Sequence, residues 1–164
     1  MKRLYLLRHA KSSWDNAGLA DHDRPLNDRG RRAAAFMGQV VRERGLLPEI
    51  VICSNAERAR QTAELFCEAA GFDGETVAES RIYEASAGRL VEIVSTIEGA
   101  YGSAMLIGHN PGMESLIYYL TGALEPMPTA AIAIIELSIE RWADIDAGCG
   151  RLADVLRPRE LMER

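Results

Sequence analysis

The chain has 164 residues, enough for one compact domain with a substantial core, and we expect a single domain over residues 1–164. Its 48% hydrophobic and 26% charged residues are typical of an ordinary globular protein. The formal net charge of -5 argues against a general nucleic-acid binder and against a basic protein of the membrane surface.

The N-terminal segment begins with a short apolar run. Residues 3–7 predict a β-strand, and the run ends at Arg8, which makes it too short for a signal peptide or a membrane span. The three cysteines, Cys53, Cys67 and Cys149, are odd in number and fit no metal-ligand spacing. We therefore expect reduced thiols, a cytoplasmic protein and no contact with membranes.

Helices and strands alternate along the rest of the chain. Asn27 is expected to cap a first helix, with Asp28 in the first turn, where the helix dipole favours an acid, and Gly45 and Pro48 end it. The later elements are a strand over 49–53, a helix over 59–67, a helix over 87–98, a strand over 104–107, a helix over 113–120 that begins at Pro111, and strands over 131–138 and 151–156.

This order of elements predicts an α/β fold, with three layers (α/β/α) around a mainly parallel sheet. In such sheets, ligands bind beyond the carboxyl ends of the strands. The first strand is followed by Arg8 and His9, the second by Arg58, and the third by His109. We therefore expect two arginines and two histidines to meet at one edge of the sheet.

These four residues suit phosphoryl transfer through a histidine. Two arginines supply about two positive charges and forked donors for the oxygens of a phosphate dianion. A neutral imidazole is a competent nucleophile near pH 7, because its ordinary pKa is about 6.5, provided that an acceptor holds its other ring nitrogen. Each residue alone has an ordinary structural explanation, such as a solvated arginine. Four of them at three successive strand ends weaken that explanation.

Four short motifs follow one another along the first two thirds of the chain. They are Leu7-Arg8-His9-Ala10 followed by Trp14, the turn Asp23-Arg24-Pro25-Leu26-Asn27-Asp28-Arg29-Gly30, the segment Ser54-Asn55-Ala56-Glu57-Arg58-Ala59-Arg60-Gln61-Thr62-Ala63, and Gly108-His109-Asn110-Pro111-Gly112. In this order they resemble the motifs of the histidine phosphatase superfamily, the phosphoglycerate mutase-like proteins. The resemblance implies a phosphoglycerate mutase-like fold.

The same resemblance implies roles for individual residues. His9 would be the phosphorylated nucleophile, and Arg8, Arg58 and His109 would complete the phosphate pocket. Glu84 falls where many members place a general acid, although the glycine and acidic residues that usually follow it are absent. Further candidates for contact with the phosphate or the substrate are Ser12, Asp15 and Asn110.

Within this family, the chain most resembles the SixA-type phosphohistidine phosphatases. The segment from Arg8 to Trp14, the short chain and the Gly-His-Asn-Pro-Gly motif carry this resemblance, and residues 82–104 leave no room for a large cap insertion. It implies a phosphatase without metal or cofactor that acts on the phosphohistidine of a histidine phosphotransfer domain. Imidazole leaves readily once it is protonated, so such an enzyme tolerates a less refined acid site.

Other functions remain open from the sequence. A phosphatase of small phosphate esters or anhydrides is the main alternative, followed by a non-catalytic phosphate-binding module, while a mutase would have to enclose its intermediate. A cysteine phosphatase would need an arginine six positions after Cys53, where the chain has Ala59. An aspartyl-phosphate enzyme built on Asp21 or Asp23 would need an apolar strand leading into those residues, and none does.

Overall fold

The computed structural model describes residues 1–162 and contains one mixed six-stranded sheet. Its strands are β1 (Lys2–Arg8), β2 (Ile50–Cys53), β3 (Glu75–Ala78), β4 (Ser103–Gly108), β5 (Ile132–Leu137) and β6 (Gly150–Leu156). They lie in the order β3-β2-β4-β1-β5-β6; β1 to β4 are parallel, and β5 is antiparallel to β1 and to β6. The domain predicted from the sequence extends to Arg164, and its last two residues lie outside the described part.

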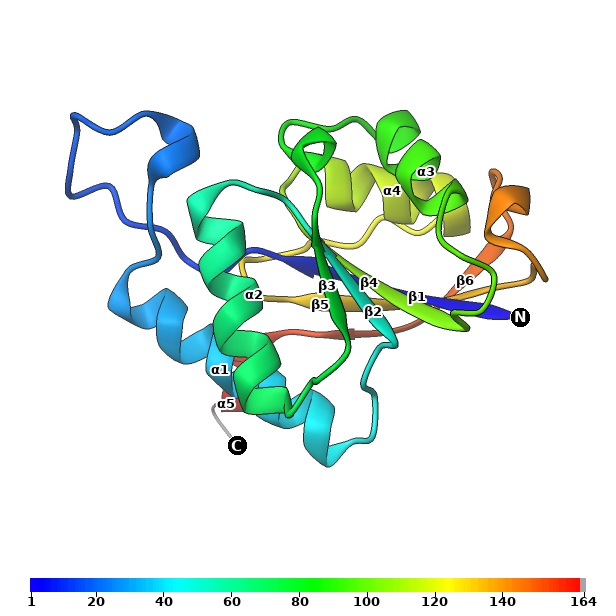
Figure 1. The fold of residues 1–164 in the computed structure, drawn as a ribbon, viewed down its shortest axis with the longest axis horizontal. Helices are drawn as coiled ribbons and strands as arrows, with labels where there is room; N and C mark the ends of the chain where they lie inside the picture. Colours follow the sequence, from blue (N-terminus) through cyan, green and yellow to red (C-terminus); the bar gives the residue numbers. More distant parts are fainter. Residues whose placement is uncertain (163–164) are drawn as a thin grey trace.

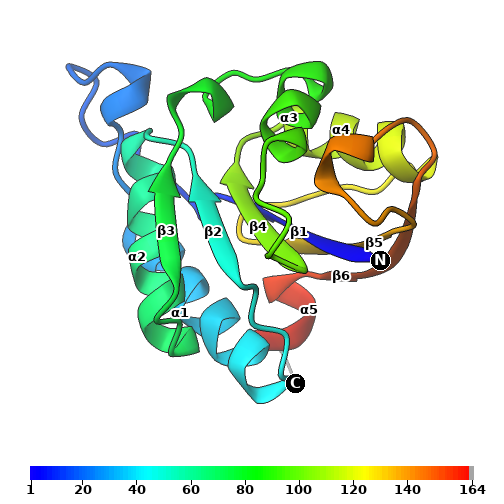
Figure 2. The same ribbon diagram turned by 45° about the vertical axis from the view of Figure 1, so that its right-hand side comes forward.

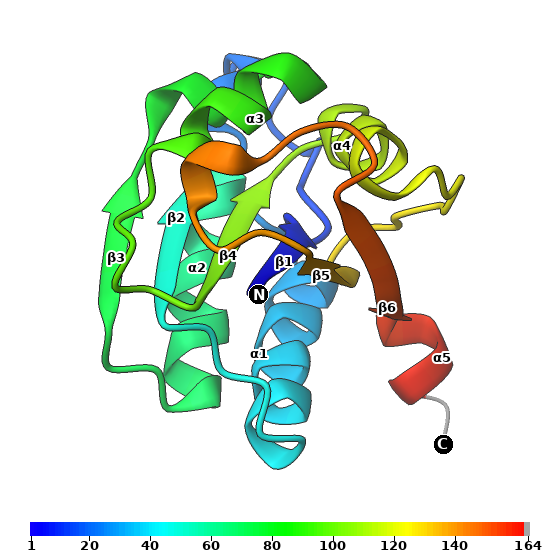
Figure 3. The same cartoon turned by 90° about the vertical axis from the view of Figure 1, so that its right-hand side faces the viewer.

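Helices cover both faces of the sheet (Figure 1). On one face, α1 (Asp28–Glu43) packs against α2 (Glu57–Ala70), and the short α5 (Pro158–Met162) lies beside α1. On the other face lie α3 (Ala87–Ser95) and α4 (Gly112–Thr121), as the turned views of Figures 2 and 3 show. The predicted three-layer α/β fold with a mainly parallel sheet is confirmed.

The first strand lies in the middle of the core and is buried on both faces. Leu4 and Leu6 pack with the layer of α3 and α4, while Tyr5 and Leu7 pack with the layer of α1 and α2, and none of the four is more than 2% exposed. A strand that is buried on both sides is apolar throughout, which explains why a short run of residues sufficed to predict it. This packing fixes the carboxyl end of β1, where His9 follows.

The predicted elements agree with the structure to within about three residues, with two omissions. Asn27 caps α1 as expected, since its Oδ1 accepts the backbone N–H of Gly30 at 2.8 Å, and Pro111 directly precedes α4. The sequence does not predict α5, which is five residues long, or β3. Three of the four β3 residues are exposed at the edge of the sheet, so this strand carries no apolar pattern.

The start of α1 lies against the segment that follows His9. A Cβ atom at Gly30 would lie 2.1 Å from the carbonyl oxygen of Lys11, so only glycine fits at this approach. The same carbonyl accepts the backbone N–H of Asn27 at 3.0 Å. The first turn of α1 and the backbone of Lys11 are therefore held together.

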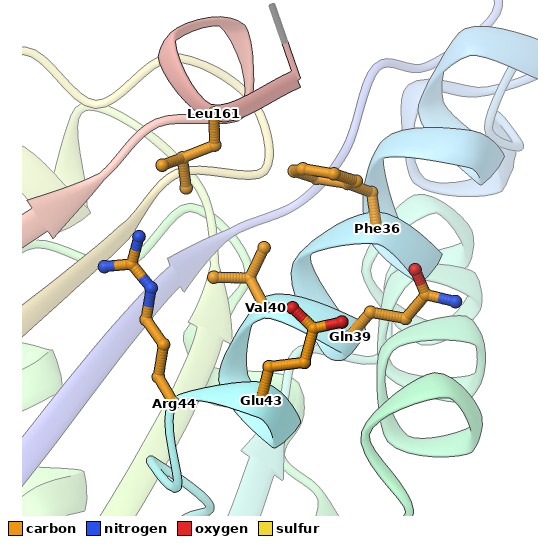
Figure 4. Close-up of a pocket in the computed structure, with 6 residues that line it drawn as sticks. All are labelled: Phe36, Gln39, Val40, Glu43, Arg44 and Leu161. Atoms are coloured by element: carbon orange, nitrogen blue, oxygen red, sulfur yellow. The ribbon is translucent and has the colours of Figure 1, made fainter. Parts of the chain in front are cut away.

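A shallow pocket lies between α1 and α5 (Figure 4). Leu161 of α5 faces Phe36 and Val40 of α1, and Arg44 and Glu43 lie toward the end of α1.

Within residues 1–162, no helix is long and apolar enough to cross a membrane.

Candidate active site

Neighbouring strands bring the predicted residues to one edge of the sheet. Parallel pairing places Arg8 at the end of β1 opposite Gly108 at the end of β4, and His9 and His109 follow. The ring centroids of these two histidines are 5.1 Å apart. Arg58 lies in the first turn of α2, which follows β2, and both arginines are close enough to lower the pKa of each histidine. The structure thus brings the four residues together.

His9 is buried, and one of its ring nitrogens is held. Nδ1 lies 2.8 Å from the carbonyl oxygen of Ala10, which can only accept, so Nδ1 carries the hydrogen and Nε2 keeps its lone pair. Burial, followed by the positive charges of Arg58 and Arg8, lowers the pKa of His9 from 6.5 to about 4, although the bond to Ala10 opposes the shift. The imidazole is therefore neutral near pH 7, as a nucleophile must be.

His109 is held by a buried serine. Its Nε2 lies 2.8 Å from Oγ of Ser54, and the same Oγ accepts the backbone N–H of Ala56 at 3.2 Å. The hydroxyl hydrogen of Ser54 has no other acceptor within residues 1–162, so it is donated to Nε2, and Nδ1 of His109 carries the ring hydrogen. Burial and then the neighbouring His9 and Arg58 lower the pKa of His109 to about 3. His109 is thus a neutral donor through Nδ1.

Three buried nitrogens around His9 have no hydrogen-bond partner. Within residues 1–162, the only buried side-chain nitrogens or oxygens in this state are Arg8 Nε, Arg58 Nε and His109 Nδ1. All three belong to the predicted phosphate pocket. A buried donor without an acceptor costs about 1–3 kcal/mol, so these groups favour an acceptor that reaches them. The oxygens of a phosphate group would provide several.

The loop between β1 and α1 brings an acid to the site. Asp21 accepts from Arg58 twice, through its backbone oxygen at 2.8 Å and through Oδ2 at 3.1 Å. The hydroxyl of Tyr83 donates to Oδ2 at 2.6 Å, and Nε of Arg24 donates to Oδ1 at 3.2 Å. The bond from Tyr83, together with Arg58, lowers the pKa of Asp21 to about 2. Asp21 is therefore an anion beside the arginine that is predicted to bind phosphate.

A cavity of about 480 Å³ opens beside His109. It is lined by Asp21, Arg58, Tyr83 and His109, together with residues 84–86 and 110–112. Glu84 is exposed on this wall, has a φ of 57°, and forms no hydrogen bond or ion pair within the described part of the chain. A left-handed backbone is uncommon outside glycine and is concentrated at functional sites. His9 does not line this cavity, but its ring is next to that of His109, which does.

The remaining predicted residues lie in different surroundings. Asn110 lines the cavity, and its Nδ2 donates to Glu114 at 2.6 Å and to the carbonyl of Met127 at 3.0 Å. Arg8 donates to the same carbonyl at 3.0 Å, so Asn110 and Arg8 are neighbours. Ser12 is buried and accepts from Arg24, whereas Asp15 is exposed and its side chain forms no bond within residues 1–162. Neither of the last two lines the cavity, and their contact with a substrate stays a prediction.

The two rival nucleophiles are poorly placed for attack. Burial raises the pKa of Cys53 to about 12, and its thiol donates to the carbonyls of Ser54 and Ala59, so it is no thiolate at neutral pH. Both carboxylate oxygens of Asp21 already accept hydrogen bonds from neighbouring side chains. Of the three candidate nucleophiles, His9 is the one whose attacking atom, Nε2, keeps a free lone pair.

Sequence reasoning missed three side chains that shape the site. Ser54 fixes the tautomer of His109, and Asp21 binds Arg58. The ring centroid of Tyr83 lies 5.4 Å from that of His109, with the two rings nearly perpendicular, and the hydroxyl of Tyr83 donates to Asp21. Ser54 gave a weak signal, because it is the first polar residue after an apolar strand. Asp21 and Tyr83 reach the site only through the folding of loops.

Comparison with known proteins finds related sequences and related folds. The sequence model of the histidine phosphatase superfamily (branch 1) matches residues 4–116. An uncharacterized protein of Mycobacterium tuberculosis is 32% identical over 93% of this chain and 100% of its own length. A protein of Agrobacterium tumefaciens assigned as the phosphohistidine phosphatase SixA is 29% identical, with a TM-score of 0.83 over 96% of this chain and 98% of that one. The protein histidine phosphatase SixA complexed with tungstate shares the fold, with 21% identity and a TM-score of 0.84 over 97% of this chain and 99% of that one.

Proposed function

The chain belongs to the histidine phosphatase superfamily, and we propose that it hydrolyses phosphohistidine on another protein through a phosphorylated His9. The observation that carries the proposal is the hydrogen bond from Nδ1 of His9 to the carbonyl of Ala10, which leaves Nε2 unprotonated. The likeness to the SixA protein of A. tumefaciens supports the choice of substrate. A histidine phosphotransfer domain is the partner that we propose.

In the first step, Nε2 of His9 attacks the phosphorus atom. The bond from Nε2 to phosphorus forms, the bond from phosphorus to the leaving imidazole breaks, and that imidazole takes a proton from Glu84 or from water. Arg8, Arg58 and Nδ1–H of His109 donate to the phosphoryl oxygens, which carry the negative charge during transfer. Because these donors are already in place, little reorganisation is required.

In the second step, water attacks the phosphorus atom of phosphorylated His9. Its oxygen forms the new bond to phosphorus, and the bond to Nε2 breaks. Inorganic phosphate leaves as H₂PO₄⁻, which carries both hydrogens of the water. His9 returns to the neutral form with Nδ1 still bonded to Ala10. The same donors hold the phosphoryl group in both steps.

The open cavity supports a substrate that is a side chain of a folded protein. Asp21, Glu84, Ser86 and Pro111 are all exposed, although they line the wall next to His109. Between β3 and β4 the chain contains only a 3₁₀ turn and α3, so no long segment covers this wall. A protein-borne phosphohistidine needs such access.

Trapping of the intermediate tests the mechanism. The protein is mixed with ³²P-labelled phosphohistidine protein, quenched within the first turnover, and assayed for acid-labile, alkali-stable label by mass spectrometry of the peptide that contains His9. We expect label on His9 in the wild type and neither label nor turnover in His9→Ala. Turnover by the wild type without label on His9 would refute the mechanism, and binding of phosphate without any turnover would indicate a binding module.

A substrate comparison separates the proposed activity from its main alternative. We expect kcat/KM for a phosphohistidine protein to exceed the values for sugar phosphates and nucleotides under the same conditions. The opposite order would identify a phosphatase of small esters or anhydrides and would leave the role of His9 intact.

A further inference from the structure

A second cavity lies between the start of α1 and α5 and is lined by cations. Its volume is about 510 Å³, and its walls include Lys11, Arg29, Arg32 and Arg159, with Pro128 and Thr129 between them. Arg29 and Arg32 belong to α1 and Arg159 to α5, so this cavity lies on the α1 face of the sheet. The cavity next to His109 is lined largely by the segments that lead into α3 and α4, on the other face.

Three of the cations that line this cavity, Lys11, Arg29 and Arg32, differ from most arginines of the protein in their pairing. Lys11, Arg29 and Arg32 are exposed and form no ion pair within residues 1–162. Many other arginines do, as Arg60 does with Glu57 and Glu64 and as Arg151 does with Glu136 at 2.8 Å. Unpaired cations at one place contrast with a net charge of -5 for the whole chain.

One of these cations is also unfavourably placed for the dipole of its helix. Arg29 is the second residue of α1, and the positive end of the helix dipole favours acids there and disfavours arginine. The nearby acid, Asp28, forms an ion pair with Arg31. The helix dipole therefore does not account for an arginine at position 29.

Two residues that line the cationic cavity are close in the sequence to residues of the candidate active site or to their hydrogen-bond partners. Lys11 is the second residue after His9, and its carbonyl oxygen accepts the backbone N–H of Asn27 at the start of α1. Pro128 follows Met127, whose carbonyl oxygen accepts from Arg8. An anionic surface that contacts the cavity would therefore lie next to the phosphoryl group on His9.

We propose that Lys11, Arg29 and Arg32 form a docking surface for acidic side chains that surround the phosphohistidine of the protein substrate. This inference rests on the proposed function and names the chemistry of the partner. The three cations are exposed and come from a loop and a helix, which suits the broad, screened attraction between protein surfaces. A site for a small anion would instead enclose its ligand with buried donors.

A charge reversal with a matched control tests the docking surface. The test variant is Arg29→Glu/Arg32→Glu, and the control is Arg42→Glu/Arg44→Glu at the other end of the same helix. Arg42 and Arg44 are exposed and unpaired within residues 1–162, so both variants change the net charge equally. Glutamate suits the first turns of α1, so the test variant should fold. Far-ultraviolet circular dichroism and thermal unfolding check this.

Two phosphohistidine peptides of equal length serve as probes, one with glutamate and one with glutamine around the phosphohistidine. We expect the wild type to hydrolyse the glutamate peptide with a kcat/KM about tenfold higher at low ionic strength, mainly through KM. Arg29→Glu/Arg32→Glu should lose this preference, and the control should keep it. For p-nitrophenyl phosphate, both variants should stay within about twofold of the wild type, because exposed charges are screened by salt and this small substrate makes no contact with the docking surface.

Several results would overturn the docking surface. If the test variant still prefers the glutamate peptide, the docking surface is wrong. If the control loses this preference as much as the test variant does, the preference depends on net charge alone and the docking surface is also wrong. The cavity would be a site for a small anion if the wild type bound tripolyphosphate more tightly than the glutamate peptide and if the test variant lost the binding of tripolyphosphate. If the wild type hydrolyses neither peptide, the proposed substrate is wrong. The docking surface is then tested separately, by measuring through fluorescence anisotropy whether the wild type binds the labelled, unphosphorylated glutamate peptide more tightly than Arg29→Glu/Arg32→Glu does.

Discussion

Arg58 and Asp21 are joined by two hydrogen bonds, from Nη1 to the backbone oxygen of Asp21 at 2.8 Å and from Nη2 to its Oδ2 at 3.1 Å. The guanidinium is thereby oriented by an anion before any phosphate arrives. Its Nε is left without a partner. The carboxylate of Asp21 thus has two opposing effects, since it orients Arg58 and also repels a second anion.

Removal of the negative charge at Asp21 should strengthen the binding of phosphate. In Asp21→Asn, the backbone oxygen still holds Arg58, while the repulsion of about 1 kcal/mol at a half-exposed position is lost. We expect the Ki of inorganic phosphate, measured as a competitive inhibitor, to fall by about three- to tenfold. A rise in Ki would show that the orientation of Arg58 by the carboxylate outweighs the repulsion. Asp23→Asn, two residues along the same turn, is the control.

The two histidines should make the protein less stable in mild acid. Their pKa values of about 4 and about 3 in the folded protein lie below the ordinary 6.5, so between pH 6.5 and 4 the unfolded chain binds protons that the folded chain does not. Their stabilising effect is complete above pH 6.5 and falls as the pH drops, by about 1–2 kcal/mol for each histidine at pH 5.

Urea unfolding at pH 7 and pH 5 measures this effect. The free energy of unfolding should fall more in the wild type than in His9→Asn/His109→Asn, in which the two imidazoles are absent. Proton NMR provides an independent check, because the ring Cε1–H signals of His9 and His109 should remain at their neutral positions down to about pH 5. Equal loss of stability in both proteins would contradict the assignment of neutral, buried imidazoles.

Ser54 should affect catalysis through the tautomer of His109. In Ser54→Ala, Nε2 of His109 loses its donor, so the ring no longer prefers the form with hydrogen on Nδ1. We expect kcat/KM to fall at least about tenfold with little change in fold, because one donor to the phosphoryl group is misplaced. Ser95→Ala, which removes an exposed hydroxyl bonded to Glu92 within α3, is the control. Unchanged kcat/KM in Ser54→Ala would show that His109 does not need this serine.

Glu84 should matter in proportion to the difficulty of the leaving group. An alkoxide leaves poorly without a proton, whereas an aryl phosphate such as p-nitrophenyl phosphate needs little help. Glu84→Gln should therefore lower kcat for an alkyl phosphate by about tenfold or more and leave kcat for the aryl phosphate within about twofold. Equal effects on both substrates would mean that Glu84 does not act as the acid.

The fold and the meeting of His9 with His109 could be predicted because they depend on buried, regular segments. β1, β2 and β4 contain short apolar runs that lead into charged or polar residues, so the pattern alone predicted their carboxyl ends. β3 could not be read, because an exposed edge strand with the sequence Glu-Thr-Val-Ala has no apolar periodicity.

The surroundings of His9 were less predictable. The acceptor for Nδ1 of His9 is a backbone carbonyl. Every residue has such a group, so residue type does not predict this hydrogen bond. Asp21 and Tyr83 are separated by 62 positions and meet only because a loop after β1 and a turn after β3 fold to the same place. Their sequence neighbourhoods are polar and irregular, and they suggest turns rather than contacts.

The central place of β1 has a consequence for how the protein is made. β1 is synthesised before both of its partners, because β4 and β5 begin more than a hundred residues later in the chain. During translation, β1 therefore has no partner strand until β4 has been made. Its apolar side chains are exposed for that time, which favours binding by chaperones and aggregation. Since His9 and His109 come together only through the pairing of β1 with β4, partial translation products should have no phosphatase activity.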